Sequence, residues 1–302
     1  MDLNPRDSLP AACTGASPDD LSRSPRVDEA LSWAAHALGA CTDRPHLEAE
    51  LLLMEVRGCR RVALFSHPEA QLTSPQVARY VHFVRRRASG EPLPYIAGHA
   101  EFFGLLFEVT PAVLIPRPET ELLVERALPW LAHRPGRRVI DVGTGSGCIS
   151  VTLAARSPHT SVIAGDISAA ALAVAQGNAR RHGVLSRVTL VQADLLAPYG
   201  SFDLIVSNPP YVADGAWDQL PTSVRREPRA ALLAGVQGLD LIERLLQQAR
   251  GRLAPGGYVL VEIGEEQANA VRALAQTAFP DATIDILPDL AGKPRVLEVS
   301  LD

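Results

Sequence analysis

Short apolar runs alternate with helically periodic segments in the part of the chain that begins at residue 137. Runs such as Leu204-Ile205-Val206 are typical of strands covered on both faces of a parallel sheet. The apolar runs predict strands at 139–142, 162–165, 188–192, 202–206, 258–263, 283–287 and 296–301. Helices are expected between them, at 148–156, 169–182, 239–252 and 267–278. The pattern predicts an α/β fold with a doubly wound, mainly parallel seven-stranded sheet, whose last two strands are antiparallel because their link is short.

Residues 24–90 have apolar positions at helical spacing instead. Helix starts are predicted at Ser24-Pro25, Asp43 and Ser74-Pro75, and the segments end near Gly39, Gly58 and Gly90. Three or more short helices predict a small N-terminal helical-bundle domain. Residues 1–23 are rich in Ser, Pro, Ala and Asp without periodicity, and we predict a disordered extension there.

A connector over residues 91–120 separates the two patterns. A short hairpin is expected over 100–110, turning near Gly104, and prolines accumulate after it. Arg117 and Glu119 lie among these prolines, which stiffen the backbone around them. Two interpretations stay open for this segment: the wall of a binding site, or a plain interdomain linker.

Composition limits the classes of protein to which the chain can belong. Its 302 residues are 47% hydrophobic, with no apolar run long enough to span a membrane and no secretion signal, so we expect a cytoplasmic protein without a membrane partner. Four scattered cysteines, without metal-ligand spacing, predict reduced thiols and no metal. The net charge is −5, and residues 1–90 hold eleven Arg against eleven acidic residues, so direct nucleic-acid binding is not expected.

The segment Asn208-Pro209-Pro210-Tyr211 follows one of the predicted buried strands. Neither proline can donate to a sheet, so the strand must end at Ser207 or Asn208. The prolines also fix the direction of the Asn208 side chain and of the carbonyl groups of Asn208 and Pro209. Such acceptors could bind both N–H bonds of an amide or an aromatic amine. The competing interpretation is an ordinary turn after a strand.

A glycine loop, residues 143–147, follows the first predicted strand of the sheet. Its glycines at alternate positions allow close approach of a ligand, whereas the spacing fits neither a dinucleotide fingerprint nor a phosphate loop. Asp166 ends the second strand, where it could accept both hydroxyls of a ribose, and Asp194 ends the third, where an adenine would lie. Each aspartate alone could simply cap a helix. Together the three features predict a nucleoside site without a pyrophosphate.

These motifs resemble those of S-adenosylmethionine-dependent methyltransferases that methylate a nitrogen of a planar group. From about residue 27 to its end, the chain is more closely similar to the protein-(glutamine-N5) methyltransferases of peptide chain release factors, the HemK family. The segments that carry this similarity are Glu91-Pro92-Leu93-Pro94-Tyr95-Ile96-x-Gly98, Leu114-Ile115-Pro116-Arg117-Pro118-Glu119-Thr120-Glu121, Ser207 to Tyr211, Glu227-Pro228-Arg229 and Asp289-Leu290-Ala291-Gly292. The Ile-Pro-Arg-Pro-Glu-Thr-Glu segment is the most specific of them.

The resemblance implies a class I, Rossmann-like methyltransferase domain over 121–302 and a docking role for the helical domain. It implies S-adenosylmethionine as cofactor, held by Gly143, Thr144, Gly145, Ser146, Gly147, Asp166, Asp194, Leu195 and Asn208. It assigns the catalytic role to Asn208, Pro209, Pro210 and Tyr211, which would also bind substrate together with Arg117 and Glu119. In this scheme Asn208 and the Pro209 carbonyl accept the two amide N–H bonds and Tyr211 packs on the amide plane. Leu195 and Gln237-Gly238 depart from the family pattern.

Three alternatives remain open at this stage. A sister enzyme could methylate a glutamine of a ribosomal protein with the same core motifs. An adenine-N6 methyltransferase would need the same two acceptors, although the acidic net charge weighs against a nucleic-acid substrate. A binding protein could keep the fold without turnover, but the intact Asn208 to Tyr211 segment argues for catalysis.

Overall fold

The structure is a computed structural model that describes residues 21, 24–132, 134, 136–196 and 200–301. The chain forms two compact units, Met1–Gly98 with Thr222–Arg226, and His99–Pro221 with Glu227–Asp302. The boundary at Gly98 divides the predicted 91–120 connector between the units. The predicted extension, 1–23, lies outside the described residues except for Leu21. In the described part of the chain, no helix is long and apolar enough to cross a membrane.

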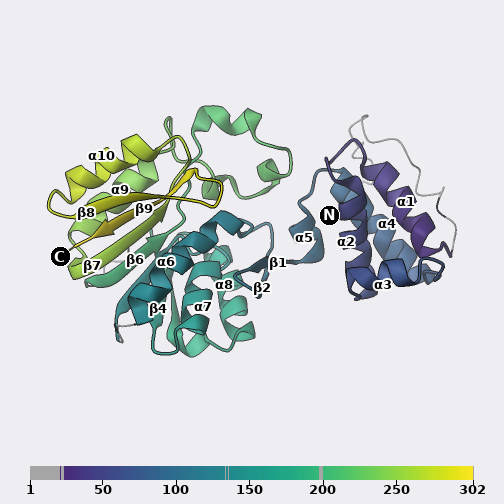
Figure 1. Ribbon diagram of the computed structural model, residues 1–302, viewed down its shortest axis with the longest axis horizontal. Coiled ribbons are helices and arrows are strands. Elements are labelled where there is room, and N and C mark those ends of the chain that lie inside the picture. The colour runs from purple at the N-terminus through teal and green to yellow at the C-terminus, as the bar shows by residue number, and fades with distance from the viewer. Residues whose placement is uncertain (1–20, 22–23, 133, 135, 197–199, 302) are drawn as a thin grey trace, which may run out of the picture. The chain divides into compact units, whose positions relative to one another are not determined.

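The first unit is helical, as predicted (Figure 1). Its helices are α1 (Val27–Leu38), α2 (Pro45–Arg57), α3 (Arg61–Ser66), α4 (Ser74–Ala88) and α5 (Leu93–Ala97). Tyr80 of α4 is buried in the unit's core, where its hydroxyl donates to the Ala49 carbonyl. The prediction that the first helix starts at Ser24-Pro25 is wrong, because the Ser24 hydroxyl instead donates to the Leu72 carbonyl and the helix begins at Val27.

The second unit contains the predicted hairpin and the predicted seven-stranded sheet. The hairpin joins β1 (His99–Phe102) to β2 (Leu105–Glu108). The sheet strands are β3 (Arg138–Val142), β4 (Ser161–Asp166), β5 (Val188–Gln192), β6 (Phe202–Ser207), β7 (Leu253–Glu262), β8 (Thr283–Pro288) and β9 (Pro294–Ser300), in the order β5-β4-β3-β6-β7-β9-β8. Neighbouring strands are parallel from β5 to β7, and β9 is antiparallel to β7 and β8. The doubly wound fold class is confirmed.

Helices cover both faces of this sheet. They are α6 (Glu121–Ala132), α7 (Cys148–Arg156) and α8 (Ala169–Arg181) on one face and α9 (Asp240–Arg250) and α10 (Ala268–Ala278) on the other (Figure 1). The helix α6 was not predicted. Its buried side chains, Leu123, Val124, Ala127 and Leu131, have helical spacing, but a proline-rich segment precedes it and Pro129 lies within it. Packing against the sheet stabilises this helix despite the proline.

The strand order places two sequence motifs next to each other. The chain winds outward from β3 to β4 and β5, then returns to the other side of β3 as β6. At such a switch point the loops after the two strands diverge and leave a crevice at the carboxyl edge of the sheet. Because Val142 is paired with Ser207, the glycine loop and Asn208 start side by side at this edge.

Candidate active site

A cavity of about 400 Å³ lies at the carboxyl ends of β3, β4, β5 and β6. This volume is within the range of small-molecule binding sites. The cavity is lined by predicted site residues from five stretches of the chain: Arg117, Gly143, Thr144, Gly145, Ser146, Asp166, Asp194, Leu195, Asn208 and Pro210. Among the predicted site residues, Glu119, Gly147, Pro209 and Tyr211 do not line it. The switch point of the sheet therefore brings together most of the predicted nucleoside site.

The glycine loop is held by a buried carboxylate that the sequence analysis did not assign. Asp141 Oδ2 accepts from the Thr144 hydroxyl (2.6 Å) and from the Ser150 backbone N–H (3.1 Å). Burial raises the pKa of Asp141 to about 6, although these hydrogen bonds favour its charged form. The carboxylate thus fixes both ends of the turn from β3 into α7.

The three glycines of this loop have different physical roles. Gly143 and Gly145 have positive φ angles of 72° and 55°, and a Cβ at Gly143 would meet nothing within 4 Å. These two positions therefore form an open backbone cradle on the cavity wall. Gly147 also has a positive φ, but its Cβ would lie 3.1 Å from the Cβ of Ala175. Gly147 is thus needed where α7 packs closely against α8.

The two acidic strand ends lie on the cavity wall. Asp166 accepts from the Gly145 N–H through Oδ2 and from the Ser168 N–H through Oδ1, both at 2.9 Å. Asp166 therefore joins the glycine loop to the residue before α8, whereas the cap of that helix is Ser168, whose hydroxyl accepts from the Ala171 N–H at 3.2 Å. Asp194 is half exposed and forms an ion pair with Arg244 at 2.7 Å.

The Asn-Pro-Pro-Tyr segment begins where predicted, since β6 ends at Ser207. The Asn208 side chain donates from Nδ2 to the Thr120 hydroxyl at 3.0 Å. Tyr211 packs on the apolar core beneath α9 and α10, and its hydroxyl lies 3.4 Å from Glu262 Oε1. Burial and the negative charge of Glu262 raise the pKa of Tyr211. The structure therefore attaches both ends of the segment to neighbouring side chains.

The segment before α6 is joined to the Glu227-Pro228-Arg229 motif by a buried carboxylate. Glu227 accepts from Arg117 at 2.5 Å and from the Ile115 backbone N–H at 3.0 Å. Arg117 lines the cavity, so the interpretation of this segment as a site wall is favoured over that of a linker. Glu119 is exposed and lies outside the cavity lining.

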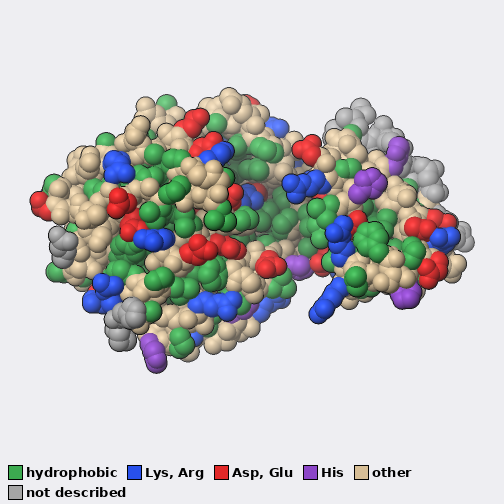
Figure 2. Space-filling view, in the orientation of Figure 1, with side chains coloured by type: hydrophobic (Ala, Val, Ile, Leu, Met, Phe, Trp, Pro, Cys, Tyr) green, Lys and Arg blue, Asp and Glu red, His purple; other side chains and the backbone are tan. Residues whose placement is uncertain are grey.

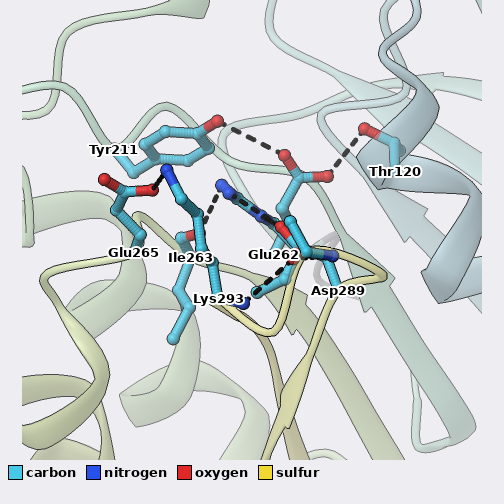
Figure 3. Close-up of polar contacts among 9 residues, drawn as sticks. Thr120, Tyr211, Glu262, Ile263, Glu265, Asp289 and Lys293 are labelled. Atoms are coloured by element: carbon cyan, nitrogen blue, oxygen red, sulfur yellow. Dashed lines mark hydrogen bonds and ion pairs between the residues drawn. The ribbon is translucent and has the colours of Figure 1, made fainter.

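Besides Asp141, the sequence analysis missed two polar residues of the site, Thr120 and Glu262. Thr120 lines the cavity, and its hydroxyl donates to Glu262 Oε2 at 2.6 Å (Figure 3). Glu262 is buried at the end of β7, where burial raises its pKa to about 7. An acidic residue inside the apolar run 258–263 was the available signal. Its partners could not be predicted, since Thr120 is 142 positions away.

Gln237-Gly238, where the sequence departs from the family pattern, lies beside Tyr211. The Gln267 side chain donates to the carbonyl groups of Tyr211 (3.0 Å) and Gly238 (3.1 Å). A Cβ at Gly238 would lie 2.2 Å from the Tyr211 carbonyl oxygen. The glycine is therefore required by close backbone approach.

Comparison with known proteins gives matches over both units. The PrmC N-terminal domain model matches residues 29–98, and the Methyltransferase small domain model matches residues 118–225. A Release factor glutamine methyltransferase of Moorella thermoacetica is 45% identical over 270 residues, 88% of this chain and 95% of that protein. One of Koribacter versatilis is 45% identical over 266 residues, 87% of this chain and 93% of that protein.

A solved structure agrees with the fold. The hMettl16 catalytic domain, in complex with MAT2A 3′UTR hairpin 1, superposes with a TM-score of 0.54 at 17% sequence identity. The match covers 84% of this chain and 91% of that chain. At this identity the similarity concerns the fold alone.

Proposed function

Because the chain belongs to the release factor glutamine methyltransferase family, we propose that it transfers a methyl group from S-adenosylmethionine to a release factor glutamine. The acceptor is the side-chain amide nitrogen, N5, of the glutamine in the Gly-Gly-Gln motif. The membership confirms the sequence-based prediction of a protein-glutamine methyltransferase. The observation that carries the finer proposal is the orientation of Asn208, whose Nδ2 is engaged by Thr120 on the wall of the cavity.

The cavity residues fit the proposed cofactor. Gly143 and Gly145 leave open space against the cavity, and the buried Ser146 hydroxyl has no hydrogen-bond partner among the described residues. The glycine loop would hold the methionine part of the cofactor, and Asp166 would accept from its ribose hydroxyls. Leu195 would pack near its adenine. S-adenosylmethionine, when bound, supplies an electrophilic methyl group. The residues of this chain supply binding and orientation.

The Asn-Pro-Pro-Tyr segment contributes to the reaction by orienting the substrate amide. An amide nitrogen is a poor nucleophile, because its lone pair is delocalised into the carbonyl group. Asn208 Oδ1 and the Pro209 carbonyl can accept its two N–H bonds, which holds the substrate nitrogen in a single direction. No general base is then needed before transfer. Tyr211 would support the plane of the amide, and its attachment to Glu262 fixes its own position.

The adenine-N6 alternative is weakened by charge. The net charge is −5, and on the face shown in Figure 2 Lys and Arg side chains are scattered among acidic ones. A nucleic-acid substrate would favour a continuous basic surface.

The proposal is tested by methyl transfer from radiolabelled S-adenosylmethionine to two release factors. One is unmethylated wild type, and in the other the Gly-Gly-Gln glutamine is replaced by alanine. We expect label in the first and none in the second. Equal labelling of both, or labelling of neither, contradicts the proposed acceptor.

A further inference from the structure

The Glu262 carboxylate is the centre of a buried hydrogen-bond network at the end of β7. It is 1% exposed, and its two oxygens accept from different elements (Figure 3). Oε2 accepts from Thr120 at 2.6 Å, and Oε1 lies 3.4 Å from the Tyr211 hydroxyl. Thr120 in turn accepts from Asn208 at 3.0 Å. One carboxylate therefore reaches both ends of the Asn-Pro-Pro-Tyr segment.

This chain of hydrogen bonds has a fixed direction. An ionised carboxylate can only accept, so the single hydroxyl hydrogen of Thr120 is committed to Glu262. The Thr120 oxygen can then act toward Asn208 only as an acceptor. Asn208 must present its NH₂ group to Thr120, which leaves Oδ1 as the oxygen that can face a ligand. Without this constraint the Asn208 amide could rotate by about half a turn and present its NH₂ group, a donor, to the ligand.

We propose that Thr120 and Glu262 are positioning residues for methyl transfer, which hold the Asn208 amide with its oxygen toward the substrate nitrogen. This inference rests on the proposed function, because the orientation matters only for a substrate that donates N–H bonds. Neither residue needs to contact the reacting atoms. Their effect is to keep the productive orientation of Asn208 populated before substrate binds.

The charged groups around Glu262 act on its ionisation in both directions. Arg295 of β9 favours the carboxylate, and its own position is fixed by Asp289, which accepts from the guanidinium at 3.2 Å. The negative charge of Glu119 opposes ionisation of Glu262. The negative charge of Glu262 in turn helps to raise the pKa of the Cys148 thiol. The family motif at 289–292 thus contributes to the site from a distance.

The geometry implies a pH dependence of turnover. Burial raises the pKa of Glu262 to about 7, against the hydrogen bonds from Thr120 and Tyr211. Below that pH the carboxyl group is protonated and can itself donate, so the direction of the network is no longer imposed. We expect kcat of the wild type to rise with pH through about 7 to a plateau. In Glu262→Gln this step should be missing, because its amide presents a donor to one of the two hydroxyls at every pH.

Three variants separate this role from a structural one. Thr120→Val should lower kcat by about ten- to a hundredfold, because it removes a hydrogen bond from a chain that ends on a carboxylate. Thr120→Ser keeps the hydroxyl and should retain kcat within about threefold, a difference of under 1 kcal/mol. Thr152→Val is the matched control, since the buried Thr152 hydroxyl of α7 has no hydrogen-bond partner within the described residues. Its kcat should equal that of the wild type.

The experiment measures kcat, KM for release factor, cofactor Kd and Tm for these variants. The expected result is a loss in kcat for Thr120→Val that Thr120→Ser restores, with an unchanged cofactor Kd. Wild-type kcat in Thr120→Val, or equal losses in Thr120→Val and Thr120→Ser, would overturn the inference. The wild-type rate reports on the proposed function, while the ratio between variants reports on the positioning residues.

A second readout needs no turnover. The Asn208 side-chain NH₂ signal in ¹⁵N NMR, assigned by its loss in Asn208→Ala, reports the bond to Thr120 directly. Slow exchange with water is expected in the wild type and in Thr120→Ser, and fast exchange in Thr120→Val. Equal exchange rates of the Asn208 NH₂ group in all three proteins would refute its hydrogen bond to Thr120, even if release factor proved not to be the substrate.

Discussion

Gly238 lies so close to the backbone of Tyr211 that replacing it with alanine should disturb the site. The new Cβ would lie 2.2 Å from the Tyr211 carbonyl oxygen and 3.0 Å from the Ala213 nitrogen. Both contacts are backbone atoms, so no flexible side chain can move away. Gly238 also has a φ of 71°, which costs an alanine additional free energy.

The magnitude follows from the two contributions. The left-handed conformation costs about 1–2 kcal/mol, and forcing an extra methyl into packed backbone adds about 1–3 kcal/mol. We expect Gly238→Ala to lower the free energy of unfolding by about 2–5 kcal/mol in total. Gly256 is a matched control, since it has a φ of 65° in the same unit and nothing within 4 Å of its Cβ position. Gly256→Ala should therefore cost only the conformational part, about 1–2 kcal/mol.

Chemical denaturation of both variants measures these differences, and methyl transfer measures the effect on Tyr211. Gly238→Ala should lose turnover under conditions where it is still folded, because the clash pushes the Tyr211 backbone away from Gln267. Gly256→Ala should keep wild-type turnover. Equal stability and equal turnover of the two variants would refute the close approach on which this reasoning depends.

Three further predictions concern other parts of the site. Asn208→Ala should abolish methyl transfer while leaving cofactor affinity, measured by titration calorimetry, within about tenfold, or 1.4 kcal/mol; surviving turnover would contradict orientation by Asn208. Glu227→Ala removes the acceptor of Arg117 and of the Ile115 N–H and should lower the free energy of unfolding by about 2–3 kcal/mol, measured by urea denaturation; an unchanged midpoint would contradict this. Burial raises the pKa of Asp141 from 3.8 to about 6, so the protonated group's contribution to the free energy of unfolding should be lost as pH rises through 6. Denaturation at several pH values should therefore show a smaller decrease of that free energy with pH in Asp141→Asn than in the wild type. The same pH dependence of the free energy of unfolding in that variant and the wild type would contradict the raised pKa.

Periodicity and turn chemistry predicted the sheet well, because its strands are set by local patterns. The strand before Asn208 had to end where two prolines begin, and the structure ends it at Ser207. Helix ends were less predictable. Ser24 looks like a helix cap, yet its hydroxyl bonds to Leu72, 48 positions away, and the helix starts later.

The candidate site was predictable only where its residues carry a local signature. The glycine loop, Asp166 and Asn208 each stand at a strand end, and parallel strands bring those ends to one edge. The supporting carboxylates had no such signature. Glu227 bonds to a backbone N–H 112 positions away, and Glu262 to a hydroxyl 142 positions away, so their roles arise only from tertiary packing.

Methylation of one glutamine amide can be observed directly by fragment mass spectrometry of a release factor. Unmethylated release factor is incubated with this protein and S-adenosylmethionine, digested and sequenced by fragmentation. We expect one added methyl group, on the glutamine side chain of Gly-Gly-Gln, and none when Asn208→Ala replaces the wild type. A release factor that stays unmodified, or a methyl group on any other residue, would show that this glutamine is not the acceptor.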